Sequence, residues 1–436
     1  MQIQHAPQTL LALLLTAATA ACGDDDGGGD TSGSGTPSTG GDGDGDGDGD
    51  GDGDGDGDGD GDGDGDGDGD GDGDGDGDGD GDGETSATTG TGDGDASGCD
   101  RAATPDQTIT EHVATDTIWS GTVRLDGSIR VNSDAHLTIE PGTTLLFAAD
   151  AGLEVGWNSG AATVTAQGTE QMPIFLCGLE PLAGFWKGLR IERNVTSNSA
   201  LEYVTIEDAG GLDAALVLHA EISVRNTSVL RSAADGVLAE SFSADSEVLN
   251  VAEAAGDPIA LIGPGALARL PLGGDLGDPT TEAVAIRFRD IDVDTIVSDP
   301  GIPYRQSEET VRIVNGADVT FAAGVRYLFE ADTSLDVGWN SADATITVEG
   351  TEDAPVLFEG AEAEAGWWQG IFVGRNVTSN SSFTHTRISH GGAEASPALH
   401  IEAAIGIDHL TLDTNAVGLW VEEQGLKDGS NNLNIS

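Results

Sequence analysis

The sequence has few basic residues, few aromatic residues and only three cysteines. Its 436 residues include 17 Lys and Arg against 78 Asp and Glu, and the formal net charge is −61. Residues 1–99 hold 28 of these acidic residues and no Lys or Arg, and the remainder is acidic as well. Such a charge repels nucleic acid and anionic membrane surfaces, so we expect neither a nucleic-acid partner nor a phosphate-binding role.

The sequence also lacks an apolar run long enough to cross a bilayer. The run from Leu10 to Leu15 is too short, and small residues follow it up to Cys22, which is typical of an export signal over residues 1–22. The segment TAATAAC, followed by GDDDGGG, resembles a bacterial lipoprotein signal. This resemblance implies that Cys22 carries a lipid anchor at the outer membrane or cell surface. The alternative is cleavage after Ala20 or Ala21 and secretion.

Residues 23–98 contain nothing that could build a core. Gly and Asp alternate from Gly41 to Gly83, and dense like charge with low hydrophobicity predicts a disordered acidic tether. The spacing does not match a calcium-binding EF-hand loop, because Glu84 at its last position would place Gly73 at its first. We therefore expect no metal and no cofactor.

The part after residue 98 shows no sustained helical period. It consists of short Val, Ile, Leu and Thr runs broken by Gly, Asn, Asp and Pro, which predicts strands. Apolar residues return every 21 to 24 positions in three sets: Ile206, Leu230 and Val251; Val217, Leu238 and Ala260; Ile388, Leu412 and Ile435. This spacing predicts parallel strands stacked in a coil.

One long segment occurs twice. It begins LEVGWNSG at Leu153 and LDVGWNSA at Leu335, an offset of 182, and 26 of the 48 positions from Leu153 to Ala200 are identical. We therefore expect two units, at 99–290 and 291–436. No linker is evident between them, so they could form one continuous solenoid.

Several motifs in these units resemble a known class of proteins. The segment LTIEPGTTLLF at Leu137–Phe147, GTEQMPIF at Gly168–Phe175 and W-x-G at Trp186–Gly188 are similar to the right-handed parallel β-helix repeats of bacterial surface proteins, within the pectin-lyase-like class. The resemblance implies an all-β fold, a right-handed parallel β-helix solenoid of two tandem units. It leaves function open, since this fold carries lyases, hydrolases, adhesins and spacers.

The charged residues offer one candidate catalytic set. If the expected register holds, Arg190, Arg193, Asp208 and His219 lie on consecutive turns, which makes them the best local set for a polysaccharide lyase or hydrolase. The alternative is ordinary charge on the solvent side of the coil. We assign no catalytic residue from the sequence.

The tryptophans offer a candidate glycan-binding strip. Aromatic rings beside amides suit the faces and hydroxyls of sugars, and such pairs recur at the same spacing in both copies. The candidate glycan contacts are Trp157, Asn158, Trp186, Trp339, Asn340 and Trp368. The alternative is that these rings cover apolar edges of the coil.

Two further features bear on the coil itself. Cys99 and Cys177 either form a disulfide, as exported chains favour, or remain unpaired. The segment RNVTSNS, at Arg193–Ser199 and Arg375–Ser381, is expected to turn corners and to form hydrogen-bonded ladders between turns.

These features favour a non-catalytic, lipid-anchored cell-surface β-helix protein for envelope structure, display or adhesion. Its expected partners are the membrane, through the lipid, and a polysaccharide or another surface protein. The alternative is a polysaccharide-active enzyme or a glycan-binding protein. The final strand at Leu433–Ile435 has no cap after it, so we expect it to fray or to pair with another chain.

Overall fold

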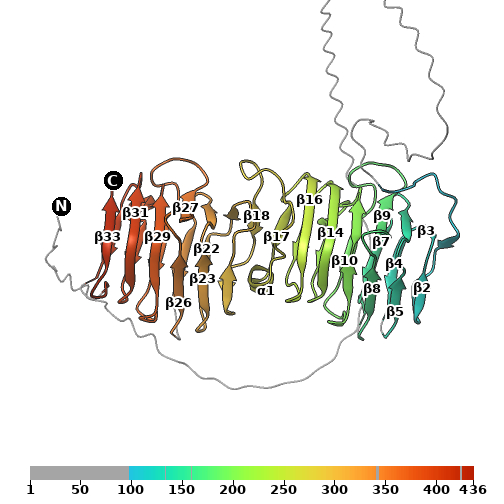
Figure 1. The fold of residues 1–436 in the computed structure, drawn as a ribbon, viewed down its shortest axis with the longest axis horizontal. Helices are drawn as coiled ribbons and strands as arrows, with labels where there is room; N and C mark the ends of the chain where they lie inside the picture. Colours follow the sequence, from blue (N-terminus) through green and yellow to red (C-terminus); the bar gives the residue numbers. More distant parts are fainter. Residues whose placement is uncertain (1–97, 133, 159, 340–342, 423–424) are drawn as a thin grey trace, which may run out of the picture. The chain divides into compact units, whose positions relative to one another are not determined.

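The strands of this protein coil into a parallel β-solenoid of about 13 turns (Figure 1). The structure is a computed structural model that describes residues 98–436 except 133, 159, 340–342 and 423–424. The expected all-β solenoid is confirmed. The signal segment, Cys22 and the tether up to residue 97 lie outside the described residues.

The strands of copy one form three columns. The first contains β2 (Thr117–Trp119), β5 (His136–Ile139), β8 (Thr163–Gln167) and β11 (Ala200–Glu202). The second contains β1 (Gln107–Ile109), β3 (Thr122–Leu125), β6 (Thr144–Phe147), β9 (Ile174–Gly178) and β12 (Val204–Glu207). The long strand β14 (Ser223–Ser232) joins these columns, and β16 (Glu247–Ala254) pairs with it. The third contains β4 (Ser128–Val131), β7 (Gly152–Val155), β10 (Leu189–Ile191), β13 (Ala214–Leu218), β15 (Asp235–Ala239), β17 (Ile259–Leu261) and β18 (Val284–Ile286).

The third column continues into copy two. Its further strands are β21 (Tyr304–Gln306), β24 (Arg326–Phe329), β27 (Val356–Gly360), β29 (Ser382–Ser389), β31 (Gly406–Asp413) and β33 (Asn431–Ile435). The strands β20 (Thr295–Val297), β23 (Asp318–Ala322) and β26 (Thr345–Glu349) stack beside them and lead to β29. A separate six-stranded sheet contains β19 (Asp290–Ile291), β22 (Thr310–Ile313), β25 (Ser334–Val337), β28 (Gly370–Val373), β30 (Leu399–Ile401) and β32 (Leu419–Val421). The helices α1 (Pro264–Ala268) and η1 (Ala393–Ala395) are short.

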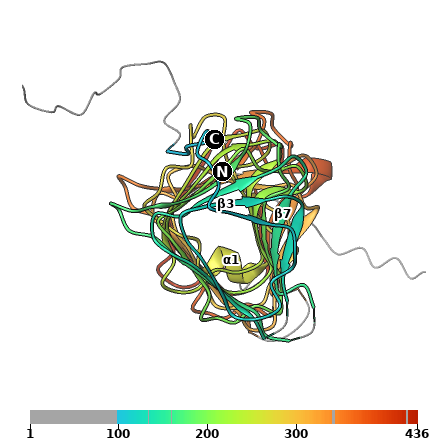
Figure 2. The ribbon, with the colours of Figure 1, turned by 90° about the vertical axis from the view of Figure 1, so that its right-hand side faces the viewer.

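Alternation along each strand sorts its side chains between the core and the solvent. In β4, for example, Ile129 and Val131 are buried while Arg130 faces outward. The inward side chains form one continuous apolar cluster from Val113 to Leu412. Figure 2, viewed along the stack, shows the strands as a ring around this interior. Each turn therefore buries its apolar residues against the turns on either side.

Hydrogen bonds between neighbouring turns hold the duplicated segment in place. The Asn194 side chain donates a hydrogen bond to the carbonyl of Gly156, one turn away. The Ser199 hydroxyl accepts one from the backbone N–H of Val164. Copy two repeats both contacts at the positions 182 residues later. The interpretation of RNVTSNS as corner and ladder residues is therefore confirmed.

Two of the three strand registers expected from the sequence are confirmed. Val217 pairs with Leu238 and Leu238 with Ala260, and Ile388, Leu412 and Ile435 also pair in order. The third register is wrong by one residue. Ile206 pairs with Val229 and not with Leu230, because Val229 points into the core while Leu230 faces outward.

Copy two is turned by one column relative to copy one. The strands β6 and β24 are equivalent, because their residue numbers differ by 182. However, β6 lies in the second column, whereas β24 continues the third. Consequently, the strands of copy two that correspond to the third column of copy one form the separate six-stranded sheet. Matching outward residues of the two copies therefore face different directions around the solenoid.

The strand β33 pairs in parallel with β31, although Leu433 and Ile435 remain exposed. Fraying of this strand, or its pairing with another chain, stays a prediction. Within the part of the chain that the structure describes, no helix has the length and apolar character needed to span a membrane.

Candidate functional site

The candidate catalytic set does not come together as one site. The Arg190 guanidinium lies 3.1 Å from the carboxylate of Asp213. Arg193 instead approaches Glu240 at 2.7 Å, and Nδ1 of His219 lies 3.5 Å from the same carboxylate. Arg193 and His219 therefore share a carboxylate, whereas Arg190 is engaged elsewhere.

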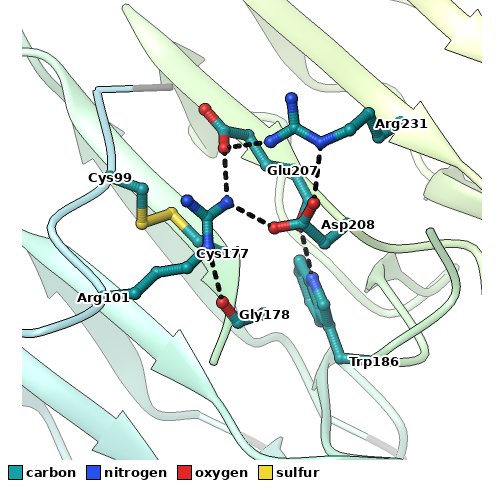
Figure 3. A network of polar contacts seen from close by, with 8 residues as sticks. All are labelled: Cys99, Arg101, Cys177, Gly178, Trp186, Glu207, Asp208 and Arg231. Atoms are coloured by element: carbon teal, nitrogen blue, oxygen red, sulfur yellow. Dashed lines mark hydrogen bonds and ion pairs between the residues drawn. A yellow bond between two sulfur atoms is a disulfide. The ribbon is translucent and has the colours of Figure 1, made fainter. Parts of the chain in front are cut away.

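The fourth member, Asp208, belongs to a separate buried network (Figure 3). Asp208 and its neighbour Glu207 are fully buried, and each carboxylate contacts the guanidinium groups of both Arg101 and Arg231 at 2.6 to 2.9 Å. Arg101 also donates a hydrogen bond to the carbonyl of Gly178. Asp208 therefore does not join Arg190, Arg193 and His219 in one site, because both of its oxygen atoms are bound by other arginines.

The same network fixes the point where the chain enters the solenoid. Cys99 and Cys177 are joined by a disulfide, with their Cα atoms 6.6 Å apart. With Leu146 they form a small buried cluster on the outer side of the second column, and Phe175 packs against it. The entry segment thus covers side chains that would otherwise face solvent. We call the disulfide and the ion pairs of Arg101 the entry clamp.

Two of the candidate glycan contacts are core residues. Trp186 and Trp368 are fully buried, and each stacks face to face on a phenylalanine, Phe147 and Phe329 respectively, at a ring distance of 3.8 Å. A ring enclosed in this way cannot meet a sugar. The glycan-binding interpretation is wrong for these two residues, since the turn they occupy points into the coil.

The first tryptophan of each pair is exposed, but the two copies differ. In copy one Trp157 is 49% exposed, and the Arg130 guanidinium lies 4.3 Å from the centre of its ring. The amide of Asn158 contacts Asn132 at 3.4 Å. Arg130 itself is held by Glu154 at 2.8 Å. The Trp157 ring is therefore partly covered by a cation.

In copy two the exposed tryptophan begins a row of rings. Trp339 is 56% exposed and lies 6.3 Å from Phe372, edge to face. Phe372 is 4.8 Å from His400, and His400 is 6.1 Å from Trp420, which is 58% exposed. Asn340, the remaining candidate, lies outside the described residues. We call Trp339, Phe372, His400 and Trp420 the aromatic face.

Strand register explains why these rings line up. Phe372, His400 and Trp420 are the outward residues of β28, β30 and β32, and they pair directly with one another. Adjacent strands lie about 4.8 Å apart, so the rings follow the axis of the solenoid. Sequence reasoning missed these three residues. The available signal was the alternation in the triplets IFV, LHI and LWV, in which the middle residue faces outward.

A hollow of about 300 Å³ lies beside the aromatic face. Its polar lining includes Thr310, Ser334, Asp336 and Gln369. Burial raises the pKa of the Asp336 carboxyl, although the hydrogen bond from Ser334 and the charge of Arg312 act in the opposite direction. The hollow therefore combines apolar rings with hydroxyl, amide and carboxyl groups.

One group among the described residues has donor atoms close enough to hold a metal ion. These are the side chains of His400, Glu402 and Glu422, whose ligand atoms lie within 4.8 Å of one another. The Arg375 guanidinium, however, lies 3.2 Å from each of the two carboxylates. Both carboxylates thus already contact an arginine, and we assign no metal to them.

Comparison of this chain with protein-family models, curated proteins and solved structures finds no match.

Proposed function

We propose that this protein is a non-catalytic adhesion or display protein of the bacterial cell envelope. In this proposal the lipid on Cys22 and the acidic tether 23–98 hold a pectin-lyase-like β-helix away from the membrane. The export signal, the Gly-Asp repeat and the duplicated coil support it together. A long coil with outward-facing side chains on every turn suits display, because each column offers an extended surface.

The observation that carries the proposal is the entry clamp. Cys99 and Cys177 are 78 residues apart in sequence, and the covalent ring that they close contains all of β1 to β8. A pull on the incoming chain would therefore act at β9 and would bypass the first turns. Disulfides persist in exported proteins. A tethered protein that bears load outside the cell would benefit from this attachment.

The ion pairs of the candidate catalytic set also favour a non-catalytic role. Arg190, Arg193 and Asp208 each have an opposite charge within 3.1 Å. An acid or base in catalysis needs a proton that it can exchange with a substrate. Arginines held by carboxylates, and a fully buried aspartate held by two arginines, suit cross-linking between turns better.

Replacing Cys22 with Ser tests the membrane attachment. We expect the wild-type protein in the membrane fraction and the Cys22→Ser protein in the soluble fraction, because serine cannot carry the thioether-linked lipid. Fractionation followed by immunoblotting measures this. A Thr19→Ser variant, altered in the same segment, is the control and should stay with the membrane. Membrane partitioning of Cys22→Ser equal to that of the wild type would contradict the proposal.

Stretching single molecules from the two ends of the chain tests the entry clamp. In the oxidised protein, the segment between the cysteines, which are 78 positions apart in sequence, should stay inaccessible to the force. At about 3.4 Å per residue, a Cys99→Ser, Cys177→Ser protein should release roughly 260 Å of additional length. We further expect this variant to lose its first turns at lower force. Equal forces for the first unfolding event in both proteins would show that the clamp does not shield these turns.

A further inference from the structure

We propose that the aromatic face of copy two binds a neutral polysaccharide chain laid along the axis of the solenoid. This inference rests on the proposed adhesive function and names its ligand class. Binding to the purified protein does not depend on where the protein resides. The failure of one proposal is therefore distinguishable from the failure of the other.

The rings provide the first part of the case. Trp339 and Trp420 are more than half exposed and lie at the two ends of the row, with Phe372 and His400 between them. Large exposed aromatic residues gathered in one patch mark interaction sites. The C–H faces of sugar rings pack on aromatic rings, and three rings in register along the axis, with Trp339 next to Phe372, fit an extended chain of several sugars.

The hollow provides the second part. Asp336 lies next to Phe372 in the strand register, and the Ser334 hydroxyl is 3.2 Å from its carboxylate. Together with Thr310 and Gln369, these side chains offer both donors and acceptors beside the rings. Binding sites commonly combine an apolar wall with a few polar groups that fix orientation. Sugar hydroxyls can donate to Asp336 and accept from Gln369.

Charge decides between neutral and anionic polysaccharides. The chain carries a net charge of −61, and Arg375 is held by Glu402 and Glu422, whose carboxylates lie near His400 of the aromatic face. Arg312, at the other end, lies 2.8 Å from Asp290. An acidic polysaccharide would thus meet repulsion and paired arginines. A neutral chain would meet neither obstacle.

Copy one shows what the same positions look like without such a face. The counterpart of Phe372 is Arg190, and the residues that follow it in the register are Val217 and Leu238. Trp157, the counterpart of Trp339, is partly covered by Arg130. The aromatic row is therefore a feature of copy two and does not follow from the fold.

Calorimetric titration of the full chain with neutral oligosaccharides tests the inference. The probes are cello-oligosaccharides and manno-oligosaccharides of two to six units, compared with oligogalacturonates of the same lengths. We expect affinity for one neutral series to rise with length and none for the anionic series. Trp420→Ala and Phe372→Ala should each weaken binding roughly tenfold or more, because exposed aromatic anchors dominate such interfaces.

Trp157→Ala, which lies outside the aromatic face, is the matched control and should bind as the wild type does. A thermal unfolding curve for each variant shows that the fold is retained. An equal loss in Trp157→Ala would overturn the inference, as would failure to bind either neutral series. So would concentration-dependent dimerisation that Trp420→Ala abolishes, since the face would then bind a second copy of this chain.

Discussion

Replacement of Arg101 by Ala is expected to lower the free energy of unfolding by about 3–5 kcal/mol, the usual cost of removing one partner from a buried ion pair. Glu207 and Asp208 are fully buried, and Arg101 contacts both carboxylates at 2.8 and 2.6 Å. Without it, two carboxylates share the single guanidinium of Arg231. Urea unfolding measures the loss, and hydrogen exchange of residues 204–209 localises it to the turns beside the entry clamp.

The control for this variant is an exposed ion pair in copy two. Arg326 lies 2.8 Å from Glu359, but its side chain is 46% exposed, so Arg326→Ala should cost less than about 1 kcal/mol. Adding Glu207→Gln to Arg101→Ala should recover part of the loss, because it removes one uncompensated charge. If Arg101→Ala cost no more than Arg326→Ala, the buried carboxylates would not depend on the entry segment.

The periodic part of this fold was predictable from sequence because each turn repeats the same requirement. Apolar residues return at nearly constant spacing, which identified Val217, Leu238 and Ala260 as partners, although the core side chains of these strands are their neighbours Leu216, Val237 and Ile259. The spacing gave the wrong partner at Leu230. Val229 and Leu230 are both apolar and satisfy the pattern equally well, but only Val229 faces inward. A shift of one residue exchanges the two sides of a strand.

The turn of copy two by one column was not predictable from the repeat. Equivalent residues share a sequence, but their direction around the axis depends on the path of the chain between the copies. That path includes α1 (Pro264–Ala268) and the short strands β18 to β20. None of these belongs to the repeated segment. The direction in which the aromatic face points is therefore a property of the junction.

The candidate sites were predictable only in part, since their partners are distant in sequence. Arg101 meets Asp208 from 107 positions away, and no local pattern connects them. Trp157 and Trp186 both stand between nearby glycines, in GWNSG and GFWKG, yet one is exposed and the other is fully buried. Trp420 lies outside the repeated segment of 48 residues, so comparison of the copies could not draw attention to it.

Replacement of Trp368 by Ala is expected to cost about 3–5 kcal/mol, as for other large buried aromatic residues. Its ring stacks on Phe329 at 3.8 Å, and its indole N–H donates a 2.9 Å hydrogen bond to the carbonyl of Ser389. The variant would lose the stacked ring and leave that carbonyl unpaired. Trp186, which repeats these contacts with Phe147 and the carbonyl of Glu207, should show a similar loss in copy one.

An exposed tryptophan of the same copy provides the control for this prediction. Trp339→Ala removes a residue of the same type from the same repeat, but from a largely solvated position, so it should change stability by no more than about 0.5 kcal/mol. We expect Trp339→Ala to weaken oligosaccharide binding while unfolding like the wild type. Trp368→Ala should unfold at a lower urea concentration than the wild type. At low temperature, its folded molecules should still bind the oligosaccharide. Equal stability of the two variants in urea would mean that burial does not separate the roles of these rings.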